Sequence, residues 1–128
     1  MEILSAGGMS IEIAFAEFAA SLPPGQKRER GGIVLAIENR LEFQELPNRS
    51  RFDNRYIAVV PAIDRLPGPL VGFWHTHLNS PLPSLTDLLQ LVRANKRFGQ
   101  SFALCIAGRR ARCMMKVGRF GIPRFRYW

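Results

Sequence analysis

Two stretches of the chain repeat apolar residues at the spacing of an α-helix. Residues 10–22 do so with Ser10 in the position of an N-cap, and a Pro-Pro-Gly stretch at 23–25 then ends the helix. Residues 84–99 end on Gly99, where a C-terminal cap belongs, and have apolar residues along one side: Leu85, Leu88, Leu89 and Val92. The pattern therefore predicts two helices.

Other stretches have the composition and alternation of β-strands. Residues 31–40 predict a strand that turns near Asn39 into a second strand over 41–46. Further strands are expected in five places: 55–60, 70–77, 101–108, 111–118 and 120–128. The last is expected at a sheet edge, because Pro123 argues against a central strand. The chain thus predicts one mixed domain over residues 1–128, of the α/β (α+β) class, with a mostly antiparallel sheet and at least two helices.

The composition is ordinary for a globular protein, with 47% hydrophobic and 22% charged residues. No apolar run approaches the ~20 residues that span a bilayer, and the N-terminus lacks the features of a secretory signal. We therefore expect a cytoplasmic protein without a membrane partner. In a reducing cytosol, Cys105 and Cys113 are expected as free thiols that face each other across a hairpin.

The charge balance narrows the class of partner. Lys and Arg number 18 against 10 acidic residues, which gives a net charge of +8. Such a balance favours acidic partners, nucleic acid or anionic surfaces. The alternative is a solvated surface from a lineage with an arginine-rich genome, because charge alone rarely specifies function.

Both histidines of the chain, His75 and His77, stand at the end of a predicted strand. Residues i and i+2 of a strand point to the same face, so the two imidazoles can be presented together, with Trp74 and Thr76 on the other face. A catalytic zinc ion typically has three protein ligands and a water. Asp87 is the candidate third ligand, because a strand–loop–helix unit can fold the first turn of the helix over the end of the strand.

Each half of this pattern also has a purely structural explanation. An H-x-H pair often occurs by chance at a strand end, and Ser84 with Asp87 fits a helix capping box. Glu29, further upstream, is by itself a surface carboxylate in a charged turn. The halves together favour a metal site more strongly than either does alone.

The order of these motifs resembles the JAMM (JAB1/MPN/Mov34) metalloproteases. The H-x-H motif spans 75–77, the P-S-x-x-D motif spans 83–87, and Glu29 precedes a Gly-Gly pair and alternating hydrophobic residues, as the family's upstream glutamate does. The resemblance extends from the first helix to the hairpin after the second. It implies a small stand-alone JAB/MPN domain of prokaryotic type with a cytidine-deaminase-like fold.

Two features depart from the family pattern. Leu78 follows the second histidine, where the family usually has proline. The six residues between His77 and Ser84 make a loop one residue shorter than we expect for the family. Both changes bear on where Ser84 and Asp87 lie, and on how active the enzyme is.

The resemblance implies a zinc metallopeptidase with one Zn²⁺ per chain, held by His75, His77 and Asp87. Glu29 would activate a zinc-bound water as general base, and Ser84 would donate a hydrogen bond to the oxyanion. The implied substrate is the bond after the C-terminal tail of a ubiquitin-like protein, in deconjugation or precursor processing. E1-like or E2-like proteins of the same pathway, including antiviral ones, are the implied further partners.

A second hypothesis comes from a different class of function. The family includes metal-free scaffolds and a branch linked to DNA repair, and the charge of +8 suits a nucleic-acid-binding module. Inactive scaffolds normally lose the metal ligands, whereas this chain keeps all of them. We therefore favour the enzyme over the scaffold or the nucleic-acid partner.

Overall fold

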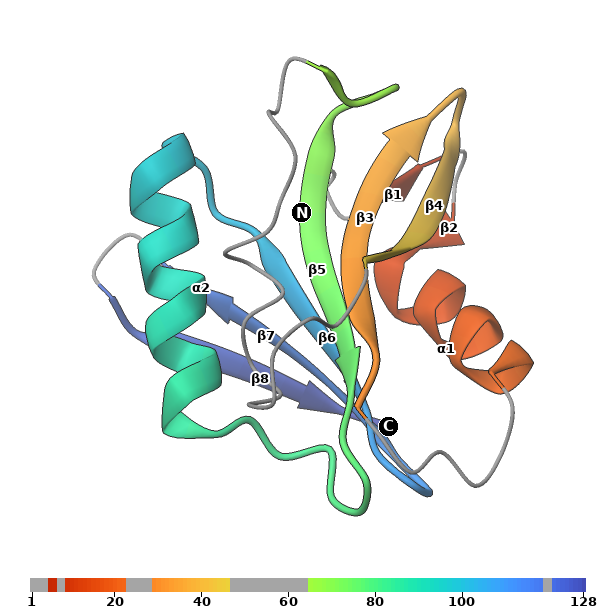
Figure 1. Cartoon of the computed structure of the whole chain (residues 1–128), viewed down its shortest axis with the longest axis vertical. Coiled ribbons are helices and arrows are strands. Elements are labelled where there is room, and N and C mark those ends of the chain that lie inside the picture. The colour runs from red at the N-terminus through yellow and green to blue at the C-terminus, as the bar shows by residue number, and fades with distance from the viewer. Residues whose placement is uncertain (1–4, 7–8, 23–28, 47–64, 119–120) are drawn as a thin grey trace.

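The computed structural model of the chain describes residues 5–6, 9–22, 29–46, 65–118 and 121–128. The expected helix stop at 23–25 and the expected strand at 55–60 lie outside them. In the described part, two helices pack on a six-stranded sheet, and a separate short pair joins β1 (Ser5–Ala6) to β2 (Met9–Ser10) (Figure 1). This confirms the expected mixed class.

The main sheet is mostly antiparallel, as the sequence predicts. Its strand order is β4-β3-β5-β6-β7-β8, and among the described strands β5 and β6 form the one parallel pair. The strands are β3 (Gly31–Ile37), β4 (Arg40–Leu46), β5 (Leu70–Thr76), β6 (Ala103–Ala107), β7 (Arg112–Val117) and β8 (Pro123–Tyr127).

The turn between β3 and β4 lies at the expected place. Glu38 and Asn39 have φ angles of 46° and 64°, and the register pairs Ile37 with Arg40 on either side. A two-residue turn with positive φ at both positions matches the twist of its flanking strands. Asn39 tolerates this left-handed conformation better than most residues.

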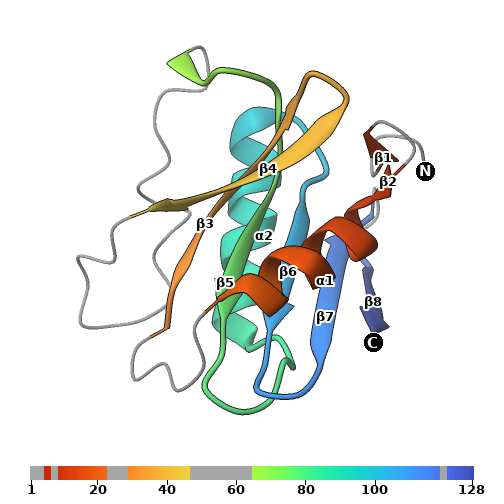
Figure 2. The same ribbon diagram turned by 90° about the vertical axis from the view of Figure 1, so that its right-hand side faces the viewer.

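The two helices cover opposite faces of the sheet, α1 (Ile11–Ser21) on one and α2 (Leu85–Phe98) on the other (Figure 2). Because successive strand residues point to opposite faces, β5 contributes to both cores. Phe73 packs on the α2 side and Trp74 on the α1 side, each 1% exposed. No helix in the described residues is long and apolar enough to cross a membrane.

Helix α2 makes the crossover that the parallel pair requires, because parallel neighbours cannot be joined by a tight turn. It begins after Ser84 as N-cap and ends at Gly99, which adopts the left-handed conformation with φ 63°. Helix α1 likewise begins after Ser10, whose Oγ accepts a hydrogen bond from the Ile13 N–H at 3.4 Å. The caps predicted from the sequence are therefore confirmed.

Only one of the four apolar residues that stand out on one side of α2 in the sequence, Leu88, packs against the core. Leu85, Leu89 and Val92 are 71%, 48% and 41% exposed. The residues that α2 buries are Asp87, Leu91 and Ala94. The helix has apolar residues on two adjacent sides, and packing on the sheet selects the one that also turns Asp87 inward.

Strand β8 lies at the edge of the sheet, where Pro123 is tolerated, as expected. The two cysteines are free and buried, which confirms the absence of a bridge between them. Their expected placement is wrong, however. The register pairs Cys113 with Ile106, so Cys105 and Cys113 point to opposite faces of the sheet rather than toward each other.

Candidate metal centre

The end of β5 positions both histidines on the α2 side of the sheet. His75 lies two residues beyond Phe73 and therefore shares its face. The imidazole rings of His75 and His77 stack with centroids 4.8 Å apart. Thr76 between them is buried, and its Oγ1 accepts the Arg30 N–H at 2.8 Å. This arrangement confirms that Thr76 packs away from the imidazoles.

The first turn of α2 brings Asp87 to the histidines. Nε2 of His75 lies 3.4 Å from Oδ1 of Asp87, and Nε2 of His77 lies 3.4 Å from Oδ2. One ligand atom from each of the three residues can be chosen so that all lie within 4.8 Å of one another. The residue predicted as the third ligand therefore lies beside the two histidines, in a group that could hold a metal ion.

These distances fit a tetrahedral ion. Ligand atoms at 2.0–2.2 Å from zinc and about 109° apart are separated by roughly 3.3–3.5 Å. The 3.4 Å between His75 Nε2 and Asp87 Oδ1 falls in this range. Oδ1 of Asp87 is buried and has no hydrogen-bond partner in the described part of the chain, a costly state that a cation would relieve.

The second oxygen of Asp87 stabilises the helix. Oδ2 accepts the Ser84 N–H at 2.7 Å, and the Asp87 N–H donates to Ser84 Oγ at 3.1 Å, which completes the capping box. The capping explanation and the metal explanation are therefore compatible, because Oδ2 accepts the cap hydrogen bond while Oδ1, 3.4 Å from Nε2 of His75, is left for an ion. The capping oxygen Oδ2 also faces Nε2 of His77. The cap also fixes the Asp87 rotamer, which a metal ligand requires.

His77 is oriented by the loop that follows it. Its Nδ1 lies 3.1 Å from the carbonyl oxygen of Ser80. A proton on Nδ1 donated to this carbonyl leaves the lone pair on Nε2, which is the nitrogen that faces Asp87. Ser80 is not among the residues that the sequence predicted for the site, because its contribution is a backbone carbonyl that any residue could supply.

The loop itself is held against the β6–β7 hairpin. The Arg109 N–H donates to the carbonyl of Asn79 at 2.7 Å. A Cβ on Gly108 would lie 2.6 Å from the nitrogen of Pro81, closer than side chains approach backbone. Gly108 is thus required for the close contact that sets where the loop delivers Ser84. The sequence offers no signal for this contact.

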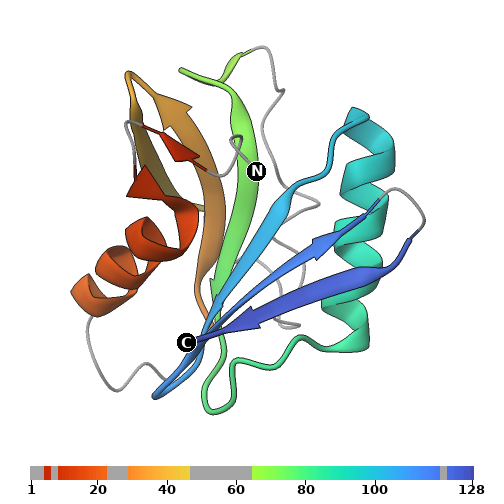
Figure 3. The same ribbon diagram turned by 180° about the vertical axis from the view of Figure 1, so that it is seen from behind.

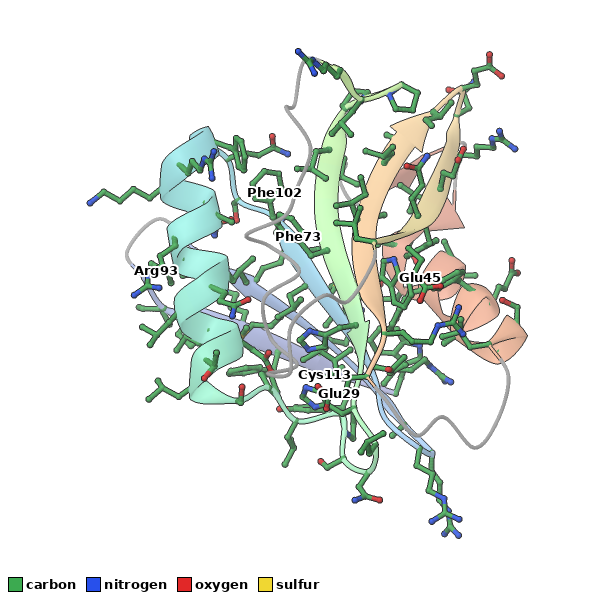
Figure 4. All side chains as sticks on the ribbon, in the orientation of Figure 1. Glu29, Glu45, Phe73, Arg93, Phe102 and Cys113 are labelled. Carbon is green, nitrogen blue, oxygen red and sulfur yellow. The ribbon has the colours of Figure 1, made fainter. Side chains whose placement is uncertain are left out.

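Glu29 lies beside the same site. Strands β3 and β5 pair Gly31 with His75, and continuing that register places Glu29 opposite His77 on the same face. Figure 4 shows Glu29 at the end of β5 near the start of the loop, whereas Glu45 lies on the α1 side. The structure therefore brings the predicted base to the predicted ligands.

The neighbouring Arg30 is turned away from this site. Its guanidinium forms a two-point ion pair with Glu45, with Nε donating to Oε2 at 2.8 Å. The hydrogen bond from Arg30 is the largest influence on the pKa of Glu45 and lowers it. Partial burial opposes this shift, and the positive charge of Arg30 adds to it. The pair fixes the start of β3 and therefore the segment that carries Glu29.

Electrostatics in the site couple the carboxylate to the imidazoles. Burial is the largest influence on Asp87 and would raise its pKa, but the imidazoles of His75 and His77, each 3.4 Å from one of its oxygens, outweigh it and lower the pKa well below its ordinary value. For His77, burial would lower the pKa, yet the hydrogen bond and charge of Asp87 and the charge of Glu29 together raise it. The site thus attracts positive charge.

Ser84 lies at the solvent-exposed end of the site, one turn from the ligands. Its Oγ accepts from the Asp87 N–H, and a hydroxyl can accept and donate at once. The hydroxyl proton is therefore available for a molecule in solution. The side chains of His75 and Asp87 are 6% and 1% exposed, whereas the His77 side chain is 14% exposed, so the centre is more open on the His77 side.

Comparison with models of known protein families finds no match to this chain, and comparison with curated proteins finds no match either. The resemblance of the motifs to the JAMM metalloproteases therefore stays a prediction.

Proposed function

We propose that the chain is a zinc-dependent hydrolase of amide or isopeptide bonds, with one Zn²⁺ held by His75, His77 and Asp87. The observation that carries this proposal is the group of three side chains whose ligand atoms lie within 4.8 Å of one another, beside a buried carboxylate oxygen, Oδ1 of Asp87, with no hydrogen-bond partner in the described residues. A carboxylate, Glu29, lies opposite one ligand in the register.

The chemistry divides between the metal and the chain. Zinc, when bound, supplies a Lewis acid that polarises a carbonyl and acidifies a water. Glu29 accepts a proton from the attacking water in this proposal and delivers it to the departing amine. Glu29 lies just before β3, whereas the proposed ligands come from the end of β5 and from α2. The base and the ligands are therefore supplied by different segments of the chain.

Ser84 has the second role. Its hydroxyl donates a hydrogen bond to the oxygen of the attacked carbonyl as negative charge develops there. Donors that act on such an oxygen contribute about 10²–10³ in turnover in other enzymes. The N-cap contact with the Asp87 N–H holds the Ser84 side chain in one rotamer, so little reorganisation is needed.

The substrate class rests on the motif resemblance. The H-x-H, P-S-x-x-D and upstream Glu motifs, in that order, support a JAB/MPN domain that cleaves after the C-terminal tail of a ubiquitin-like protein. E1-like or E2-like proteins of such a pathway are the proposed partners. The mixed fold with one helix on each face of the sheet is compatible with this assignment.

The experiment compares zinc content and cleavage in three proteins. The substrate is ubiquitin with a fluorophore joined through an amide at its C-terminus, alongside a bacterial ubiquitin-like protein with the same group. We expect Glu29→Gln to retain one zinc per chain and to lose at least about 10²-fold in cleavage. The matched control, Glu17→Gln, changes an exposed carboxylate on α1 and keeps full activity. Cleavage at the wild-type rate by Glu29→Gln would show that the mechanism is wrong.

The alternative function is a metal-free scaffold or a basic nucleic-acid-binding module. The net charge of +8 is the observation in its favour. Binding to phosphate is lost steeply between low and physiological salt. DNA binding with this salt dependence, together with no bound zinc, would favour the module over the enzyme.

A further inference from the structure

Strand β8 (Pro123–Tyr127) has an open outer edge, with no further strand beyond it in the described sheet. Arg112 and Trp128 exchange two backbone hydrogen bonds, at 2.8 and 3.1 Å. Hydrogen-bonded and non-hydrogen-bonded pairs alternate along an antiparallel ladder. Phe125 and Tyr127 therefore direct their N–H and C=O groups away from β7, toward the open edge.

The two faces of β8 differ in chemistry. Phe125 and Tyr127 lie opposite residues of the α2-side core, so their rings are on that face, 47% and 51% exposed and 6.3 Å apart. Arg124 and Arg126 are exposed on the other face. One of them, Arg126, lies 3.6 Å from Glu12. The edge is thus apolar on one side and positive on the other.

Further exposed apolar side chains lie on the α2 side of the sheet. All of the large hydrophobic residues that are exposed in the described part, except Ile13, lie on α2, on the loop before it, or at β8. On α2 they are Leu85, Leu89 and Val92.

We propose that β8 docks an extended segment of a partner protein in which acidic residues alternate with apolar ones. The segment adds a strand to the sheet by hydrogen bonding to the outward N–H and C=O groups of Phe125 and Tyr127. Its apolar side chains lie over the two rings, and its acidic side chains face Arg124 and Arg126. This inference goes beyond the proposed hydrolase and does not depend on zinc.

The placement of charge argues against two other occupants. A second copy paired through its own β8 would set Arg124 and Arg126 against like charges, in two chains that each have a net charge of +8. Single-stranded nucleic acid needs cations and stacking rings on one surface. Here the two exposed rings, Phe125 and Tyr127, lie on the face opposite Arg124 and Arg126. Trp128 shares the arginine face but packs against the α1-side core.

The docking edge ends near the candidate metal centre. Across the sheet, Thr76 on β5 pairs with Ala107 on β6, and Ala107 pairs with Arg112 on β7. Arg112 in turn pairs with Trp128, the residue after β8. Three strand spacings of about 4.8 Å make a separation of roughly 14 Å. Figure 3 shows the end of β8 at the same end of the sheet as the end of β5. A docked partner is thus held close to the site.

The experiment uses the full chain, with EDTA present so that the result is independent of zinc. The probes are fluorescein-labelled peptides of about eight residues that alternate glutamate with valine, or lysine with valine. Fluorescence anisotropy is expected to show binding of the acidic peptide at least about tenfold tighter than the lysine peptide. Arg124→Glu is expected to weaken binding of the acidic peptide about three- to tenfold.

Amide exchange measured by NMR gives a direct readout of strand addition. In the free protein the Phe125 and Tyr127 amides exchange faster than those of Arg124 and Arg126, which bond to β7. With the acidic peptide, the two fast amides become protected. Phe125→Pro removes one outward N–H at an edge position that tolerates proline and abolishes binding, whereas Phe125→Thr keeps the N–H and retains most of it.

Four outcomes would overturn the proposal: equal binding of both peptides, no binding of either at millimolar concentration, unchanged exchange of the Phe125 and Tyr127 amides, or unchanged binding to Phe125→Pro. Competition of oligothymidine with the acidic peptide would assign the edge to nucleic acid instead. A dimer in sedimentation that Phe125→Pro converts to a monomer would assign it to a second copy.

Discussion

Substitution of Asp87 by Asn tests the candidate metal centre through the stability of the fold. The side chain keeps its shape and an oxygen that can accept the Ser84 N–H, but it loses the charge that faces both histidines. A folded protein that binds zinc at about one hundred times its dissociation constant gains roughly 2.7 kcal/mol in unfolding free energy. The wild-type chain is expected to show this gain.

The expected change in melting temperature follows from the size of the chain. With 128 residues and ~2.1 cal/mol/K per residue, the unfolding entropy is about 0.27 kcal/mol/K. The zinc gain then corresponds to about 10 °C. If the loss of one ligand weakens zinc binding by about 100-fold, the gain in unfolding free energy at the same free zinc falls to roughly 0.4 kcal/mol. This corresponds to less than about 2 °C in melting temperature.

The assay is thermal unfolding followed by circular dichroism, with EDTA and with buffered zinc. Ser84→Ala is the matched control, because it removes the cap hydroxyl at a cost of about 1 kcal/mol without removing a ligand. We expect it to melt about 4 °C lower under both conditions and to keep the full zinc increment. An Asp87→Asn protein that gains as much from zinc as the wild type would refute the three-ligand site.

Three further predictions follow from the electrostatics and packing of the structure. Without zinc, the raised pKa of His77 stabilises the fold below its unfolded value of 6.5, and the lowered pKa of Asp87 stabilises it above its unfolded value of 3.8. The contribution of these two groups to the stability of the zinc-free protein is therefore largest between these values. Zinc needs neutral imidazoles, so bound zinc is expected to shift the contribution of the site to higher pH. Melting curves across this pH range with and without zinc test this, and identical profiles would contradict it. Burial raises the pKa of the Cys113 thiol to about 11, and a hydrogen bond with Tyr127 partly opposes this shift. A disulfide reagent at pH 8 is therefore expected to modify Cys113 slowly in the folded chain and rapidly in denaturant. Gly108→Ala places a Cβ 2.6 Å from the loop after β5, so it is expected to cost about 1–3 kcal/mol in stability and to weaken zinc binding. The control is Gly118→Ala, whose Cβ has its nearest atom at 3.7 Å and leaves zinc binding unchanged. Competition for zinc with a chelator measures both variants.

Much of the fold can be predicted from local signals in the sequence. Ser10 and Ser84 cap helices because their hydroxyls accept backbone N–H groups that the helix leaves without partners. Gly99 and Asn39 end elements because they tolerate positive φ. These signals depend on a few neighbouring residues, so one sequence is enough to find them.

The orientation of α2 could not be predicted in the same way. The helix has Leu85 and Leu89 on one side and Leu91 and Ala94 on another, and both patterns have helical period. Which side is buried depends on the sheet, which is assembled from strands far away in sequence. The burial of Asp87 is the result of that choice.

The candidate site was predictable to the extent that its spacing is local. The two-residue period of a strand puts His75 and His77 on one face, and a capping box fixes Asp87 within a turn of Ser84. The approach of Glu29 depends on long-range pairing of β3 with β5, and the contact at Gly108 on packing between two loops. Neither is encoded in a short pattern.

The span of the ligands along the chain has a consequence for folding. His75, His77 and Asp87 come from one continuous unit of strand, loop and helix turn, so little loop-closure entropy opposes their meeting. Contacts of such low sequence separation form early, whereas the pairing of Arg30 with Thr76 spans 46 residues. Zinc is therefore expected to accelerate folding more than it slows unfolding. A chain that binds zinc before β3 pairs with β5 does not yet have Glu29 beside the ion, so under the proposed function zinc binding is expected to precede activity.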